Sequence, residues 1–158
     1  MENKLTFPEE APADTKITVG IAALVIHENK ILLEQRADCG LWACPGGRME
    51  PGENISLTAT REVKEETNID IEIKRIFAIY SDPKYGMVRR YTSDSFSQQC
   101  VDIYLLAAPL SFEIKKSDES LRVEYFALDN TPSNIAPFAR EVIKDYKRNP
   151  SAKFTILK

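Results

Sequence analysis

The chain has 158 residues, 43% of them hydrophobic, which suits one domain with a full core and is too short for two domains of normal size. Its net charge of −3 argues against a protein that neutralises many phosphates along DNA or RNA. No apolar run reaches the roughly 20 residues that cross a bilayer, and the polar, acidic first residues differ from a secretory signal. We therefore expect a cytoplasmic protein whose partners include neither nucleic acid nor membranes.

The first predicted elements are an arm and a hairpin. Residues 1–16 lack sustained periodicity and predict an N-terminal arm ahead of a single domain that spans residues 17–158. The runs KITVGIAALVI (16–26) and KILLEQRA (30–37) are rich in Val, Ile and Leu and flank a short polar turn, which predicts a β-hairpin. The next stretch, CGLWACPGGRMEPGE (39–53), is interrupted by Gly and Pro and predicts an irregular loop.

A helix and a second group of strands are predicted after this loop. Asn54 is a suitable N-cap for a helix that runs to about Thr67, and Asn68 suits the left-handed position that ends it. Three strands follow, over 69–81, 98–110 and 120–128, and an amphipathic helix over 136–148 closes the chain. This order predicts an α/β fold, with a mixed sheet covered by helices on both faces.

The cysteines and the single histidine offer little chemistry. Cys39, Cys44 and Cys100 show no CxxC spacing, so neither a disulfide framework nor a zinc site is expected and the thiols are predicted to be reduced and structural. His27 follows an apolar run and precedes a turn, so it is predicted to end a strand. Any catalysis would then depend on acids and metals.

Three glutamates share one side of the first predicted helix. Glu62, Glu65 and Glu66 stand at positions i, i+3 and i+4, which places them within a sector about 100° wide. This sector borders the face predicted to be buried, so the repulsion between the carboxylates needs an opposing charge. Hard oxygen ligands of this kind suit Mg²⁺ or Mn²⁺. The alternative is an acidic helix face that is merely solvated.

The loop before these glutamates completes a longer pattern. From Gly47 to Ile69 the chain reads GRMEPGENISLTATREVKEETNI, and this stretch resembles the box of the Nudix hydrolase family. The matching positions are Gly47, Glu53, Arg61, Glu62, Val63, Glu65, Glu66 and Ile69. Only Asn68 departs from the pattern, which has Gly there, and Asn is the best other residue for a left-handed position. So many fixed spacings form a specific signal.

The resemblance implies a fold, a reaction and roles for the box residues. It implies an α/β/α sandwich that hydrolyses a nucleoside diphosphate linked to another group, with Mg²⁺ or Mn²⁺ as cofactor. Glu62, Glu65 and Glu66 would ligate the metal, and the carbonyl of Gly46 would add a backbone oxygen. Arg61 and Glu53 would brace these ligands; the alternative for them is a surface salt bridge of little energetic value.

Residues outside the box are candidates for water activation and for substrate binding. Glu119, in the sequence DES before a strand, would assist water activation or a second metal, unless it is only a turn acid. Arg36, at the end of the second hairpin strand, is a candidate for phosphate binding; the alternative is a plain surface charge. The long connection at 81–96 offers further candidates to contact phosphates and to stack on a base. These are Tyr85, Arg89, Arg90 and Tyr91.

The substrate is predicted less sharply than the reaction. Pro83 lies near a position where relatives that cleave ADP-ribose have proline, whereas Tyr85 lies near a position where relatives that cleave dinucleoside polyphosphates have tyrosine. The later strands favour ADP-ribose or a nucleotide sugar. The alternatives are a hydrolase of nucleoside triphosphates or dinucleoside polyphosphates, and a domain that senses a nucleotide without cleaving it. The resemblance also makes a homodimer possible.

Overall fold

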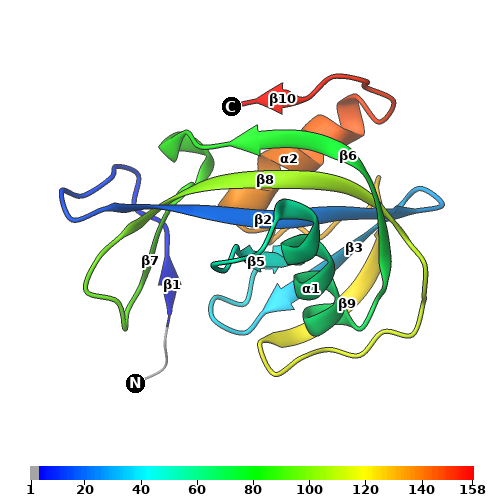
Figure 1. The fold of residues 1–158 in the computed structure, drawn as a ribbon, viewed down its shortest axis with the longest axis horizontal. Helices are drawn as coiled ribbons and strands as arrows, with labels where there is room; N and C mark the ends of the chain where they lie inside the picture. The colour runs from blue at the N-terminus through cyan, green and yellow to red at the C-terminus, as the bar shows by residue number, and fades with distance from the viewer. Residues whose placement is uncertain (1–3) are drawn as a thin grey trace.

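The computed structural model describes residues 4–158 and contains a mixed β-sheet with one helix on each side (Figure 1). The strands are β1 (Leu5–Thr6), β2 (Lys16–His27), β3 (Lys30–Arg36), β4 (Trp42–Ala43), β5 (Gly46–Arg48), β6 (Ile71–Tyr80), β7 (Val88–Tyr91), β8 (Gln98–Pro109), β9 (Ser120–Ala127) and β10 (Ile156–Leu157). The helices are α1 (Ile55–Thr67), the 3₁₀ turn η1 (Pro83–Tyr85) and α2 (Pro137–Arg148). The predicted α/β class with a mixed sheet is confirmed.

The predicted hairpin is present, but its two strands are paired only beside the turn and separate beyond it. Glu28 and Asn29 both have positive φ, at 45° and 63°, as a tight two-residue turn between twisted strands requires. β2 and β3 pair only next to this turn, at Ile26 with Ile31 and at His27 with Lys30. Farther along, β2 pairs in parallel with β8 and antiparallel with β5, while β3 pairs with β4 and β9. The connection from β4 to β5 therefore crosses the opening between two parts of the sheet.

Alternating residues of β2 build the core on both sides of the sheet. Ile21 packs with Ala59 of α1, and Ala23 belongs to a cluster that contains Val63 of the same helix. Leu24 packs instead in the large cluster that contains buried residues of α2. This period of two explains why the two helices cover opposite faces, as Figure 1 shows, with α1 in front of β2 and α2 behind β8. Neither helix of the described residues is long and apolar enough to span a membrane.

The short strands escaped sequence-based prediction. The loop prediction was wrong for Trp42–Ala43 and Gly46–Arg48, which form β4 and β5 because they pair with long strands on either side of the opening. Within the predicted arm, Leu5–Thr6 pairs with β7 and Leu5 is buried in the core. These strands are too short to display a periodicity. The first three residues of the arm lie outside the described part of the chain, and the division at residue 16 stays a prediction.

Candidate active site

Local signals fix both ends of α1. The side chain of Asn54 accepts a hydrogen bond from the backbone N–H of Leu57 at 2.9 Å, as an N-cap does. Asn68 adopts the left-handed conformation, with φ of 63°, and its backbone N–H donates to the carbonyl of Lys64. The predicted inner face, formed by Ala59, Val63 and Thr67, is fully buried. Both caps and the buried face of the helix therefore follow the sequence prediction.

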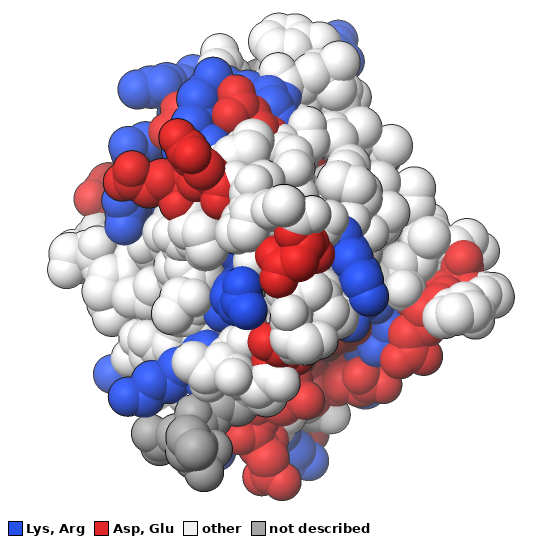
Figure 2. Space-filling view, turned by 90° about the vertical axis from the view of Figure 1, so that its left-hand side faces the viewer, with Lys and Arg blue, Asp and Glu red and all other residues white. Residues whose placement is uncertain are grey.

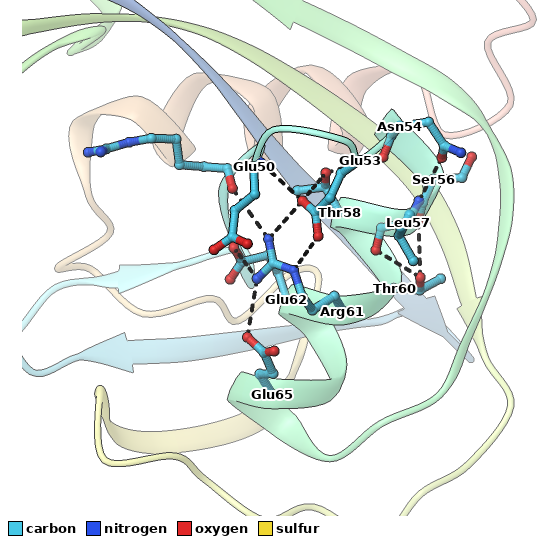
Figure 3. A network of polar contacts seen from close by, with 11 residues as sticks. Glu50, Glu53, Asn54, Ser56, Leu57, Thr58, Thr60, Arg61, Glu62 and Glu65 are labelled. Atoms are coloured by element: carbon cyan, nitrogen blue, oxygen red, sulfur yellow. Dashed lines mark hydrogen bonds and ion pairs between the residues drawn. The ribbon is translucent and has the colours of Figure 1, made fainter.

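Arg61 lies at the centre of the box (Figure 3). Its Nε and Nη2 donate to the two carboxylate oxygens of Glu53, at 2.5 and 3.0 Å. Its Nη1 donates to Glu62 at 2.9 Å and to Glu65 at 3.2 Å. The hydrogen bonds from Arg61 hold the pKa of Glu53 at about 2, and the hydroxyl of Thr58 supports the same carboxylate at 2.8 Å. One guanidinium thus fixes the positions of three carboxylates.

The glycine-rich loop comes close to the other glutamates. Glu66 is buried, and its carboxylate accepts a hydrogen bond from the backbone N–H of Gly46 at 2.8 Å. A Cβ on Gly47 would lie 2.6 Å from Oε2 of Glu62, and a Cβ on Gly46 would overlap the backbone of β2. Only glycine at both positions lets the loop backbone approach this closely. Burial raises the pKa of Glu62, and it raises that of Glu66 further, with a contribution from Glu34.

Glu34 was missed by sequence reasoning. It lies on β3, is 1% exposed, and its Oε2 accepts a hydrogen bond from the hydroxyl of Ser120 at 2.5 Å. Its Oε1 has no hydrogen-bond partner among residues 4–158, although Arg36 lies 3.7 Å away. Burial raises the pKa of Glu34. The sequence did contain a signal for this residue: Glu34 lies two positions after Leu32 in an apolar strand, so the alternation of a strand places it on the same, buried face.

Glu119 lies at the edge of the same group of acids. Its charge contributes to the raised pKa of Glu62 and of Glu34, so it stands within electrostatic reach of both. Its side chain is exposed, whereas the next residue, Ser120, is buried. The structure thus brings Glu119 close to the box, across more than 50 residues of sequence.

The carboxylates suit a hard divalent cation by their chemistry. All the candidate ligand atoms are oxygens, and Oε1 of Glu34 is buried without a hydrogen-bond partner among the described residues. Among residues 4–158 no three acid, histidine or cysteine side chains are already arranged to hold an ion. Glu62 and Glu65 are instead paired with Arg61. Arg61 contacts one oxygen of Glu62 and one of Glu65, so a cation would bind each carboxylate through its other oxygen.

A cavity of about 100 Å³ adjoins the box glycines. Three of the predicted substrate-binding residues line it, namely Arg36, Arg89 and Tyr91, together with Gly46 and Gly47. Arg36 donates to the hydroxyl of Tyr91 at 3.3 Å and to the carboxylate of Asp38. Basic and acidic side chains are interspersed on the side of the molecule shown in Figure 2. The positive charge of Arg36 is likewise matched by an acid, because Asp38 lies 2.7 Å away.

Asp102 and Phe138 also line this cavity and were not predicted. Asp102 is buried and pairs with Arg89, whose guanidinium stacks over the ring of Phe138 at 4.0 Å. Asp102 Oδ1 and Arg89 Nε have no hydrogen-bond partner among the described residues. A Cβ on Gly20 would overlap that oxygen, so glycine is required opposite Asp102. The signal in the sequence was a single acid in the apolar strand VDIYLL.

The other two predicted substrate residues lie elsewhere. Tyr85, in η1, packs its ring against Tyr80 at a centroid distance of 5.6 Å. Arg90 forms an ion pair with Asp14 at 3.6 Å. Arg90 is directed away from the cavity because it alternates with Arg89 and Tyr91 along β7. The structure therefore brings together Arg36, Arg89 and Tyr91 and separates Tyr85 and Arg90 from them.

The fold and the box together define a hydrolase that acts on phosphoric anhydrides. Comparison with known proteins names the family: the NUDIX domain profile matches residues 16–146, and the chain belongs to this family. The Nudix-type α/β/α sandwich expected from the resemblance is confirmed.

Three relatives illustrate the match. The chain is 30% identical over 133 residues to an ADP-ribose pyrophosphatase of Methanocaldococcus jannaschii, covering 82% of this chain and 73% of that protein. It is 35% identical over 82 residues to a MutT-like protein of Streptomyces ambofaciens, covering 51% of this chain and 53% of that protein. The structure of a NUDIX hydrolase from Nitrosomonas europaea superposes with a TM-score of 0.74 and 27% identity, covering 89% and 78% of the two chains. The chain thus spans only about half the length of the second relative.

Proposed function

We propose that this protein is a Mg²⁺- or Mn²⁺-dependent pyrophosphohydrolase that cleaves ADP-ribose or a nucleotide sugar between its two phosphates. The observation that carries the proposal is the position of Glu62 and Glu66 against Gly46 and Gly47, next to a cavity lined by arginines. The relative named as an ADP-ribose pyrophosphatase supports this substrate class. The small-molecule nucleotide would be the main partner; a cytoplasmic location and a homodimer remain predictions.

Glu62, Glu65, Glu66 and the carbonyl of Gly46 would hold the cation. When bound, the cation neutralises charge on the pyrophosphate and acidifies a water molecule. Arg61 limits the rotation of Glu62 and Glu65, so that both carboxylates are held in nearly fixed positions before a cation binds. Glu53 in turn fixes Arg61 at two points. This bracing reduces the reorganisation that binding would otherwise require.

The cavity residues would bind the substrate beside this cluster. Arg36 and Arg89 would offer guanidinium groups to the phosphates, and Tyr91 would offer its aromatic side chain. Glu119 would accept a proton as water attacks one phosphorus and the bridging oxygen leaves with the other phosphate. For ADP-ribose the products would be AMP and ribose 5-phosphate. Tyr85 and Arg90 could contact the substrate only through parts of it that extend beyond the cavity.

The test is a substrate panel with Mg²⁺ and with Mn²⁺, in which the products are identified. The panel contains ADP-ribose, an ADP-hexose, a dinucleoside polyphosphate and nucleoside triphosphates. Glu65→Gln should abolish most turnover, whereas Glu72→Gln, an exposed acid on β6, should retain it. A folded wild-type protein that cleaves none of these compounds would refute the proposal.

A second candidate substrate class has support from one observation. A relative of Bacillus subtilis named a putative 8-oxo-dGTP diphosphatase is 39% identical to the chain over 69 residues. A hydrolase of nucleoside triphosphates or dinucleoside polyphosphates is therefore the main alternative. Release of pyrophosphate from a triphosphate would identify it. A nucleotide-sensing domain is the third possibility, and a ligand that binds and stays intact during long incubation with Mg²⁺ would favour it.

A further inference from the structure

Glu34 and Ser120 connect the core of the sheet to the residue beside the box. Ser120 is 1% exposed and donates its hydroxyl to Oε2 of Glu34 at 2.5 Å, across 86 residues of sequence. Glu119 immediately precedes it. The backbone N–H of Ala37 donates to the carbonyl of Glu119 at 2.8 Å. The backbone that follows the Cα of Glu119 is therefore anchored at two points, to β3 and to the turn after it, while the N–H of Glu119 donates to the hydroxyl of Ser117.

A β-bulge lies at the same place. Gln35 pairs with Arg122, but Arg36 pairs with Ser120, so Leu121 is the extra residue on β9. A bulge changes the direction in which the neighbouring side chains point, and bulges are frequent beside active sites. Here the bulge lets Ser120 turn inward toward Glu34, while Glu119 stays at the surface within reach of Glu62.

The buried carboxylate of Glu34 is costly in a purely structural role. It is 1% exposed, one oxygen has no hydrogen-bond partner among the described residues, and Glu66 lies close enough to repel it. An apolar residue would fill this position on an apolar strand without that cost. A carboxylate at this position is explained if its hydrogen bond to Ser120 has a use beyond stability.

We propose that Glu34 and Ser120 are positioning residues: their hydrogen bond, together with the bulge, holds Glu119 at the distance from the box at which it can act on the attacking water. This inference rests on the proposed function and goes further, because it assigns roles to two residues outside the Nudix box. Removal of the hydroxyl of Ser120 allows the segment around Glu119 to shift, and displacements of about 1 Å from a catalytic geometry can cost up to 100-fold in rate.

The test is a mutant cycle measured on the substrate that the wild type cleaves best. Ser120→Ala should lower kcat by about 10-fold or more and leave KM nearly unchanged, whereas Ser120→Thr, which keeps a hydroxyl, should restore most of the rate. Glu34→Gln, which keeps an acceptor for Ser120, should be milder than Glu34→Ala. The double variant Ser120→Ala/Glu119→Gln should be no slower than Glu119→Gln alone, because both changes remove the same contribution.

Each contrary outcome has its own meaning. If the effects of Ser120→Ala and Glu119→Gln on kcat multiply, Ser120 acts independently of Glu119 and the inference is wrong. If Glu119→Gln retains wild-type turnover, the inference is also wrong, while a loss of turnover in Glu65→Gln still supports the proposed hydrolase. Thermal unfolding of every variant separates a general loss of folded protein from a change in kcat, because only folded enzyme enters the rate.

Discussion

Arg61 and Glu53 face each other with two parallel hydrogen bonds, of 2.5 and 3.0 Å, eight residues apart in sequence. The remaining guanidinium nitrogen contacts Glu62 and Glu65. Planar guanidinium geometry is essential to this arrangement, because an ammonium group is a single point charge. The pair therefore connects the loop before α1 to the carboxylates on the helix.

Arg61→Lys should reduce kcat by about 10- to 100-fold, the usual effect of losing a group that orients metal ligands. The lysine keeps the charge but cannot reach Glu53 at two points and Glu62 at the same time. Steady-state kinetics at saturating cation measure the effect, with Arg75→Lys, a distant arginine on β6, as the matched control. Equal activity of the two variants would exclude a bracing role for Arg61.

The same pair should make stability depend on pH. Glu53 has a pKa of about 2 in the folded protein, against an ordinary value of 4.5. A lowered pKa means that the folded state favours the ionised form, so this contribution is fully present above about pH 4.5 and is lost as the pH falls toward 2. Glu53→Gln should remove this pH-dependent contribution. The variant should be less stable than wild type above about pH 4.5, and the difference in unfolding free energy should shrink as the pH falls toward 2. Denaturant unfolding at several pH values measures this, and parallel pH profiles would contradict the prediction.

Local chemistry made α1 and the hairpin predictable, because their signals lie within a few residues of each other. Asn54, Asn68 and the turn at Glu28 and Asn29 needed no tertiary information. The pairing of Glu34 with Ser120 was not predictable, because it joins strands 86 residues apart through a bulge that leaves no mark in the sequence. Arg89 and Arg90 could not be distinguished until β7 fixed which of them faces inward.

Asn68 is the one departure from the box, and substitutions at this position test how well the departure is tolerated. Its φ is 63°, and its side chain donates to the carbonyl of Glu113 at 2.7 Å. Asn68→Ala should lower the free energy of unfolding by about 1–2 kcal/mol, since a side chain with a Cβ and no local hydrogen bond is strained in this conformation. Asn68→Gly should stay within about 0.5 kcal/mol of wild type, because relief of strain offsets the lost hydrogen bond. Denaturant titrations check both values, and an Asn68→Ala variant as stable as Asn68→Gly would contradict the argument.

Loss of the buried ion pair between Asp102 and Arg89 should strongly reduce the stability of the protein. Asp102→Ala leaves the guanidinium of Arg89 buried against Phe138 without its acid, which should cost about 3–5 kcal/mol of unfolding free energy. Replacing both residues, as Asp102→Leu with Arg89→Met, should recover much of this loss, because no unpaired charge remains. Chemical denaturation measures all three proteins. A double variant no more stable than Asp102→Ala would show that the cost comes from lost packing and not from the unpaired charge.

Cation binding should oppose the repulsion among the buried acids. Burial raises the pKa of Glu66, and Glu34 contributes, so without a cation the ionised form of Glu66 is disfavoured in the folded protein. For an acid with a raised pKa, stability increases as the pH falls through that pKa, and it is lowest at high pH. Glu66→Gln should therefore be at least as stable as wild type at pH 8 in the presence of a chelator.

Addition of Mg²⁺ or Mn²⁺ should stabilise the wild type. At a hundredfold excess over Kd, the unfolding free energy should increase by about 2.7 kcal/mol, and the Tm should rise accordingly. The same addition should raise the Tm of Glu66→Gln much less. Equal shifts in the two proteins would mean that the cation binds somewhere other than beside Glu66.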